Sequence, residues 1–437
     1  MVQGAIIRGG AVAEVAGKIK KRLLLILQQF WLTFEFFGKN GLANHAAASA
    51  YGFLLSAAPV LLVISLFVSN FLFRSPELAS VMFEQIGFIS DFFNTGDFVG
   101  NFLSVANPGI AGFISAIPIF WATRLCALSL QRGLGVIFPA KKTSPFRATA
   151  VSLGLGFLII LFIFVMLLGS RLALSILDSM DFAIARTLRS IVLALPERAL
   201  SLGGFFILTL ISYRFVPANR QEWKHIIPGA LTCMVFFLLF NLGFSLIISP
   251  DRYNLIYGAL GSLFLFLLNV YFFFYFYLFG AQLIIVQATS DALLFIRFRQ
   301  HHNRPAFSTK PWHKIFASPP WPLLKYIKAY SEGDLVFIRG SMTQEVFYIL
   351  SGKVGVYLDD EYRNKVALID EKHFFGEMEL VAGEGRSASI KAETDLSVLL
   401  LPRELYRSIL QIDQETDQSI IQGLSERLRS SNKREFT

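Results

Sequence analysis

Charged residues are scarce in this sequence. Only 16% of its 437 residues are Asp, Glu, Lys or Arg and 54% are hydrophobic, whereas an average soluble protein has roughly 25% charged residues. The shortage is uneven: residues 1–322 hold 25 of the 40 basic and 12 of the 31 acidic residues, and residues 323–437 hold the other 15 and 19. This predicts a basic, apolar region followed by a mildly acidic domain of ordinary composition.

Cysteine and histidine are also rare, and each shortage excludes a class of protein. The two cysteines, Cys126 and Cys233, each lie in an apolar run, which excludes a disulfide scaffold. The six histidines form no cluster with Asp of the kind that metal-dependent hydrolysis requires. We therefore expect no metal, no catalytic residues and no enzyme. The basic residues flank apolar segments instead of alternating with stacking aromatics, so we expect no nucleic-acid partner.

Long apolar runs fill the first three quarters of the chain. A helix needs roughly 20 apolar residues to cross a bilayer, and about six segments qualify, at 44–73, 108–137, 147–172, 199–216, 226–249 and 257–288. Lys and Arg gather before the first segment and after the second, fourth and sixth, which predicts that both termini are cytoplasmic. Residues 18–38 mix basic and apolar side chains, which fits either a helix lying in the membrane interface or a shallow membrane helix.

Polar side chains inside these segments are candidates for a hydrophilic path or a headgroup site, because polar groups in lipid are costly. The candidates are His45, Arg124, Asn241, Asn269 and Gln282. The alternative interpretation is hydrogen bonding between helices, with the arginine reaching the cytoplasmic interface. Both interpretations stay open at this point.

Three strings carry a family resemblance: NHAAASAYGFLLSAAPVLLVISLF (44–67), VPANRQEWKHIIPGAL (216–231) and YGALGSLFLFLLNVYFFFYFYLFGAQL (257–283). They resemble the YihY/virulence factor BrkB family over about residues 20–295, although Gln282 stands where we expect Glu. The resemblance implies a bacterial inner-membrane protein tied to envelope integrity or to movement of an envelope solute or lipid. Some members carried an old label as a ribonuclease, which these residues do not support.

The sequence changes character at Leu323. The string SEGDLVFIRGSMTQEVFYILSGKVGVYLDD alternates short β-branched and aromatic runs with Gly333, Gly340 and Gly352, which predicts the many short antiparallel strands of a β-jelly roll. The tail after residue 401 returns to helical periodicity and predicts flanking helices. The predicted fold is thus an α-helical polytopic membrane domain followed by a β-jelly roll with flanking helices.

The segment FGEMELVAGEGRSASIKA (375–392) is similar to the signature of cyclic-nucleotide-binding domains, and the likeness covers about residues 325–430. It implies cyclic AMP or cyclic GMP as a regulatory ligand and no other cofactor. By position, Gly376 and Glu377 would hold the ribose, Arg386 the phosphate with help from Ser387, and Ala388 would line the pocket. These residue types suit such a ligand, since a glycine permits close approach and an arginine supplies a charge-assisted phosphate contact.

Two positions depart from that family pattern: Glu379, where a small residue is common, and Gly385, where proline often stands. A carboxylate at 379 either repels the phosphate or points into water. The alternative is a domain that kept the fold but binds nothing and serves for docking.

The predicted order is an N-terminal arm (1–43), a six-span domain (44–296), a basic proline-containing linker (297–322) and a cyclic-nucleotide-binding-like domain (323–437). We expect a transporter-like or envelope-integrity protein regulated by its cytosolic domain, with the lipid bilayer and a cyclic nucleotide as partners. A non-transporting membrane scaffold is the main alternative, and a homo-oligomer stays open. A gated channel is disfavoured because the chain has neither a TVGYG-like filter nor an arginine ladder, and a membrane ribonuclease is disfavoured further.

Overall fold

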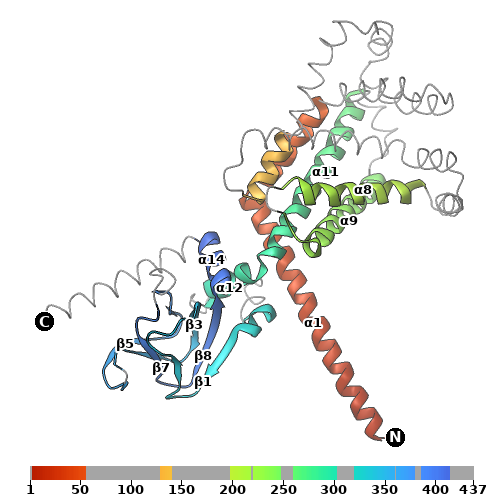
Figure 1. Cartoon of the computed structure of the whole chain (residues 1–437). Helices are drawn as coiled ribbons and strands as arrows, with labels where there is room; N and C mark the ends of the chain where they lie inside the picture. The colour runs from red at the N-terminus through yellow and green to blue at the C-terminus, as the bar shows by residue number, and fades with distance from the viewer. Residues whose placement is uncertain are drawn as a thin grey trace, which may run out of the picture. The chain divides into compact units, whose positions relative to one another are not determined.

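A computed structural model of the chain divides into two compact units, one formed by Thr33–Ala288 and the other by Met1–Leu32 with Thr289–Thr437 (Figure 1). Each unit is described by itself. The structure describes residues 2–55, 128–139, 197–217, 220–247, 259–302, 319–359, 361–378 and 385–413.

The first unit is helical throughout its described residues. It begins at Thr33 inside the long helix α1 (Val2–Lys39), most of which belongs to the other unit, and the chain is helical again over 42–55 and 128–137. Three apolar helices follow, α8 (Glu197–Phe215), α9 (Trp223–Ile247) and α11 (Ala259–Ala288). Two stretches, Trp223–Phe244 and Phe264–Ala288, are long and apolar enough to cross a membrane, and Leu202–Phe215 is a shorter apolar helix.

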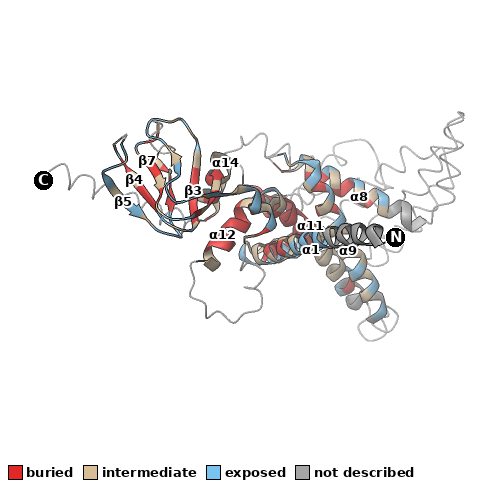
Figure 2. Cartoon of the chain, turned by 90° about the horizontal axis from the view of Figure 1, so that it is seen from below, coloured by how far each residue is buried: buried red, intermediate tan, exposed pale blue. Residues whose placement is uncertain are grey.

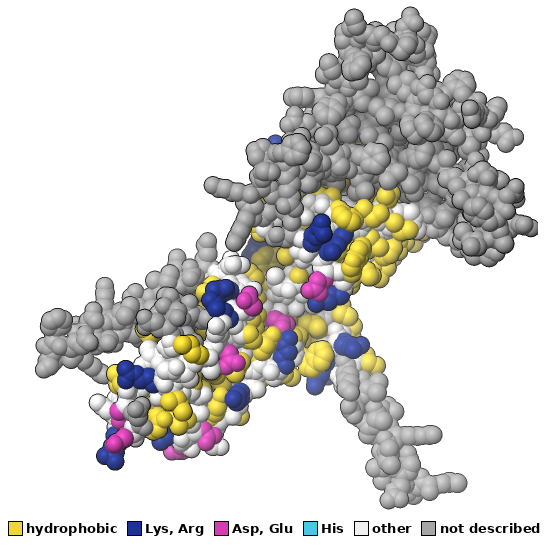
Figure 3. Space-filling view, viewed as in Figure 1, with side chains coloured by type: hydrophobic (Ala, Val, Ile, Leu, Met, Phe, Trp, Pro, Cys, Tyr) yellow, Lys and Arg dark blue, Asp and Glu magenta, His cyan; other side chains and the backbone are white. Residues whose placement is uncertain are grey.

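Exposed side chains on these helices are largely apolar. On α9, six large hydrophobic residues between 39% and 87% exposed recur along the helix, namely Ile227, Leu231, Val235, Leu239, Leu242 and Leu246. Hydrophobic side chains cover the visible side of α8 and α9 (Figure 3). A helix that shows this many apolar side chains outward is suited to lipid. The helical first region is therefore confirmed. The count of six spans stays a prediction, because residues 147–172 and much of 44–73 and 108–137 lie outside the described residues.

Helices α9 and α11 approach each other closely at two glycines, Gly229 and Gly280. A Cβ built on Gly229 would lie 2.8 Å from the carbonyl oxygen of Gly280, and one built on Gly280 would lie 2.6 Å from that of Gly229. Small residues at the contact of two membrane helices let the backbones pack closely. Neither position has room for a side chain.

The C-terminal domain of the second unit consists of eight short strands in two four-stranded antiparallel sheets, ordered β1-β8-β3-β6 and β2-β7-β4-β5. The strands are β1 (Ile327–Tyr330), β2 (Leu335–Phe337), β3 (Glu345–Ser351), β4 (Val354–Tyr357), β5 (Lys365–Ile369), β6 (Phe374–Phe375), β7 (Ser389–Ala392) and β8 (Leu396–Pro402). Buried apolar residues from both sheets, among them Phe347 and Ile390, form the core between them (Figure 2). The predicted β-domain of short antiparallel strands is confirmed.

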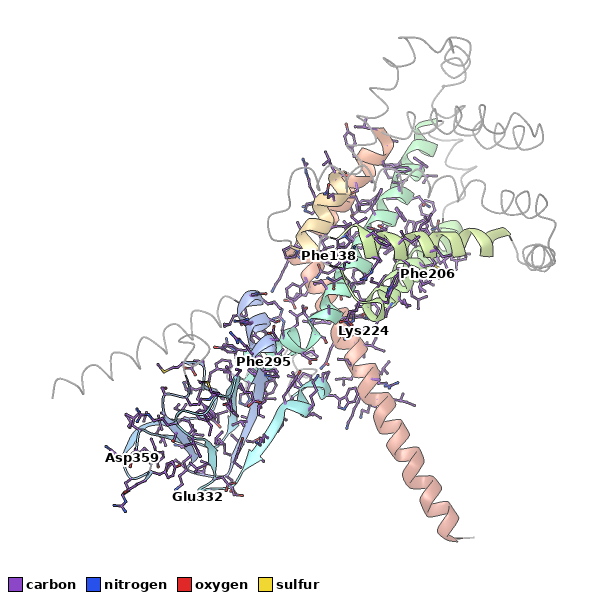
Figure 4. The ribbon with its side chains drawn as sticks, in the orientation of Figure 1. Phe138, Phe206, Lys224, Phe295, Glu332 and Asp359 are labelled. Atoms are coloured by element: carbon purple, nitrogen blue, oxygen red, sulfur yellow. The ribbon has the colours of Figure 1, made fainter. Side chains whose placement is uncertain are left out.

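A second core forms on the outer face of the β1-β8-β3-β6 sheet. Helices α12 (Ser290–His302) and α14 (Arg403–Ile412) and the 3₁₀ turn η2 (Trp321–Tyr326) pack there. Phe295 of α12 is 0% exposed and meets the ring of Tyr348 edge-on at 5.4 Å and that of Phe374 at 6.0 Å (Figure 4).

Helix α12 starts one residue after α11 ends, and only Thr289 separates them. Residues 297–302, the first six of the predicted linker, belong to this helix because Phe298 and Arg299 are buried in the domain. Residues 303–318 lie outside the described residues. The β-domain is therefore joined to the last apolar helix by a helix that is part of its own core.

Candidate functional site

Arg386 is the centre of the candidate site. It is 3% exposed, and its guanidinium donates hydrogen bonds to Thr343 Oγ1 at 2.9 Å, to the Gly376 carbonyl at 2.6 Å and to the Glu345 carbonyl at 2.7 Å. The guanidinium carbon lies 4.1 Å from the ring centre of Phe337, a cation–π contact. Uncharged oxygens and an aromatic face thus hold the cation in one place.

Gly376 is held against Arg386 by its backbone conformation. Its φ is +79°, in the region that favours glycine. A Cβ added there would lie 2.5 Å from a terminal nitrogen of the Arg386 guanidinium. The glycine directly follows β6, so the arginine side chain runs over the backbone at the end of that strand. The sequence placed Gly376 and Arg386 in one site, and the structure brings them together.

The other predicted site residues follow these two along the chain. Glu377 is 3% exposed, Ser387 is exposed and Ala388 is half-buried. Residues 379–384 lie outside the described residues, so the departure at Glu379 does too. Gly385 is described, and a Cβ there would lie 3.0 Å from the Gly340 carbonyl oxygen.

Sequence reasoning missed the residues that position Arg386. Phe337, Thr343 and the Glu345 carbonyl come from a segment that precedes Arg386 by more than forty residues. Backbone hydrogen bonds also join the two segments, from the Gly340 N–H to the Arg386 carbonyl at 2.8 Å and from the Arg386 N–H to the Ser341 carbonyl at 3.1 Å. The available signal was the apolar run of β2, Leu335–Phe337, which predicts that Phe337 packs in the domain but not its contact with a cation.

The polar candidates of the membrane region lie mostly between helices. Asn269 of α11 donates to the Asn241 side chain of α9 at 3.0 Å, and Asn40 donates to the Gln282 side chain at 3.1 Å. The first pair joins two helices, as hydrogen bonding between helices in a membrane predicts, and the second joins the turn after α1 to α11. They are compatible with simple packing, and the hydrophilic path stays a prediction.

His45 and Arg124 complete the predicted path. His45 is half-buried and lies beside Gly133, whose added Cβ would come within 3.2 Å of the His45 Cβ. Arg124 lies outside the described residues. Within the described ranges, no group of three or more His, Cys, Asp and Glu is arranged to hold a metal ion.

Two family profiles match this chain. The one described as virulence factor BrkB matches residues 33–294, more than half of the chain. The chain belongs to the virulence factor BrkB family. The second profile, the cyclic nucleotide-binding domain, matches residues 327–413. The chain is thus a BrkB-family membrane protein with a cyclic nucleotide-binding domain at its C-terminal end, and the two sequence resemblances are confirmed.

Individual relatives match one or the other part of this BrkB-family protein. A UPF0761 membrane protein of Aggregatibacter aphrophilus is 29% identical over 62% of this chain and 95% of its own. A cGMP-dependent 3′,5′-cGMP phosphodiesterase A of Dictyostelium discoideum is 32% identical over 21% of this chain and 10% of its own. The solved structure of the Thermus thermophilus catabolite activator protein shows 29% identity over 25% of this chain and 54% of its own, with a TM-score of 0.23.

Proposed function

We propose that this protein handles an envelope solute or lipid in the bacterial inner membrane, and that a cyclic nucleotide bound to its cytosolic C-terminal domain regulates it. Both termini are cytoplasmic in this proposal. One observation carries it: α12, which follows the last apolar helix after a single residue, belongs to the core of the domain that holds Arg386. The chain therefore has a short covalent route between a ligand site and the membrane helices.

The binding step assigns one role to each predicted residue. Arg386 makes a charge-assisted hydrogen bond to the cyclic phosphate, and Ser387, which is exposed beside it, adds a hydroxyl. Gly376 allows the guanidinium and the ligand to lie close to the backbone. Glu377 accepts a hydrogen bond from the ribose hydroxyl, and Ala388 contacts the ligand's edge.

The regulatory step runs through the strands that Arg386 contacts. Its guanidinium donates hydrogen bonds to the Glu345 carbonyl at the start of β3 and to the Gly376 carbonyl directly after β6. The same two strands carry Tyr348 and Phe374, whose rings pack on Phe295 of α12. A ligand that draws the guanidinium toward its phosphate shifts these strands, and with them the equilibrium position of α12. A buried ion pair between Arg299 and Asp413, at 3.6 Å, ties α12 to the end of α14.

A membrane scaffold with a ligand-free docking domain is the second candidate, and one observation favours it. The Arg386 guanidinium already makes three hydrogen bonds within the domain and lies over the Phe337 ring. That arrangement suits an arginine whose role is to hold loops and strands together. In this case the domain keeps its fold without a nucleotide, and nothing crosses the bilayer.

Flux measurements in reconstituted vesicles separate the two candidates. Full-length protein is placed in phospholipid vesicles, and the movement of a fluorescent phospholipid and of trapped small solutes is followed with and without cyclic AMP or cyclic GMP. We expect a flux that one nucleotide changes and that stops responding in Arg386→Ala. The matched control is Arg339→Ala, because Arg339 is an exposed arginine of the same domain that donates to the Leu358 carbonyl. Absence of any flux supports the scaffold, and a flux indifferent to both nucleotides removes the regulatory step.

A further inference from the structure

Helix α1 carries an exposed apolar stripe. Its members, Ile19, Leu23, Ile26, Leu27 and Phe34, are between 48% and 62% exposed. Their spacing of four, seven, eight and fifteen residues from the first places them on one side of a helix with 3.6 residues per turn. Exposed apolar side chains that are grouped in this way mark a surface that an apolar partner covers.

Basic residues flank the stripe. Lys20 and Arg22, both exposed, lie on either side of Leu23 around the helix, and Lys21 lies opposite, about 160° from Leu23. The sequence between Glu14 and Glu35 contains no acidic residue. Described hydrophobic and basic side chains lie side by side on this part of α1 (Figure 3). An apolar stripe with cations along its edges suits an anionic lipid surface, where the long basic side chains reach the headgroups.

The far end of α1 is fixed to a membrane helix. Phe37 packs on the rings of Tyr275 and Phe279 at 4.6 and 5.7 Å, and Asn40 donates to Gln282 at 3.1 Å. These partners lie in the second half of α11, the half from which the chain leaves for α12. The end of α1 is therefore fixed to the half of this spanning segment that leads out to α12.

We infer that residues 19–34 of α1 form an interfacial helix that lies along the membrane with its apolar stripe in the lipid, held by anionic headgroups. The inference is independent of the proposed function, because it concerns neither flux nor nucleotide binding. It also fixes an orientation. Residues 19–34 then lie roughly parallel to the bilayer surface, because that orientation places the whole stripe in lipid and keeps Lys20 and Arg22 at the headgroups.

Spin labelling of the full-length protein tests this orientation. Cys126 and Cys233 are replaced by alanine, and one cysteine is introduced by Leu23→Cys on the stripe or by Lys21→Cys on the opposite side. The labelled proteins are reconstituted in phosphatidylcholine vesicles, with and without about 30% phosphatidylglycerol as the anionic lipid. Accessibility of each label to oxygen, which enters lipid, is compared with accessibility to a water-soluble nickel complex.

We expect the oxygen-to-nickel ratio at position 23 to be several-fold higher than at position 21, most clearly with anionic lipid present. Equal ratios at the two positions would place the helix in water and overturn the inference. Spin–spin broadening at position 23 that disappears on dilution with unlabelled protein would also overturn it, because a second copy would then cover the stripe.

A charge variant tests the lipid preference separately. In the Lys20→Gln/Arg22→Gln protein labelled at position 23, the ratio should no longer respond to phosphatidylglycerol. A response as large as that of the unchanged helix would refute the role of anionic headgroups. Since these residues are exposed, the variant is expected to fold, and its elution as a single species in detergent provides the control.

Discussion

Phe295 is the residue whose removal most directly tests whether α12 belongs to the C-terminal domain. Its ring is 0% exposed and packs between the rings of Tyr348 and Phe374. Replacing a buried phenylalanine by alanine costs about 3–5 kcal/mol, which includes the cavity that remains. Domains are stable by only about 5–15 kcal/mol, so Phe295→Ala should remove a large part of the stability of this one.

Urea unfolding of a fragment that begins at Thr289 measures the loss. With a denaturant slope of roughly 1–3 kcal/mol per molar urea, the midpoint should fall by about 2 M. Gln300→Ala is the matched control on the same helix, because Gln300 is only half-buried and such substitutions usually change stability by less than about 0.5 kcal/mol.

Two results would refute the reasoning. If Phe295→Ala lowers the midpoint no more than Gln300→Ala, the helix is not part of the core. If a fragment that begins at residue 319 and lacks α12 unfolds at the same urea concentration as the longer one, the same conclusion follows. In either case the covalent route from the ligand site to the membrane helices loses its physical basis.

Three further predictions follow from single contacts. Gly229→Val should destabilise the α9–α11 pair by about 1–3 kcal/mol in denaturant titrations in detergent, whereas Gly243→Ala, with nothing within 4 Å of its Cβ, should not. Gly376→Ala should abolish nucleotide binding in calorimetry, because its Cβ would meet a guanidinium nitrogen at 2.5 Å and its φ is strained. Burial lowers the pKa of His302, so the unfolded state binds more protons and the domain should lose stability as pH falls from about 7 to 5. In His302→Gln that pH dependence should flatten, and an unchanged pH profile would contradict the assignment.

The sequence predicted the parts of the fold that depend on local pattern. Apolar runs predicted α9 and α11, and the glycine-punctuated runs after Leu323 predicted short antiparallel strands. These signals are local because lipid requires a long apolar helix and because several turns of the β-domain have a glycine at positive φ, at Gly333, Gly340 and Gly352. The order of strands in the two sheets has no such local signal and could not be predicted.

The extent of α12 shows where local pattern is insufficient. Arg297 and Arg299 follow the last span in a basic run, which is typical of a solvated linker. In the structure Arg299 is 8% exposed and pairs with Asp413, more than a hundred residues away. A single sequence gives no sign of a pairing over that distance. Composition alone therefore ends the helix too early.

The candidate site, like the fold, was predicted only in part. Family resemblance placed Gly376 and Arg386 in one site. The Arg386 guanidinium donates to the Gly376 carbonyl at 2.6 Å, and the role of both residues in ligand binding stays a prediction. Phe337 and Thr343, which hold the arginine from an earlier segment, were not predicted. A hydroxyl and an aromatic ring are common in any β-domain, and only the fold gives them a role here.

The central claim is that Arg386 belongs to a site for a cyclic nucleotide, and calorimetry tests it most directly. Full-length protein in lipid nanodiscs is titrated with cyclic AMP and with cyclic GMP up to about 1 mM. We predict that one of them binds, and that Arg386→Ala weakens it by about tenfold or more, as the loss of a charge-assisted hydrogen bond implies. No heat with either nucleotide, or equal affinity in the variant, would contradict the account.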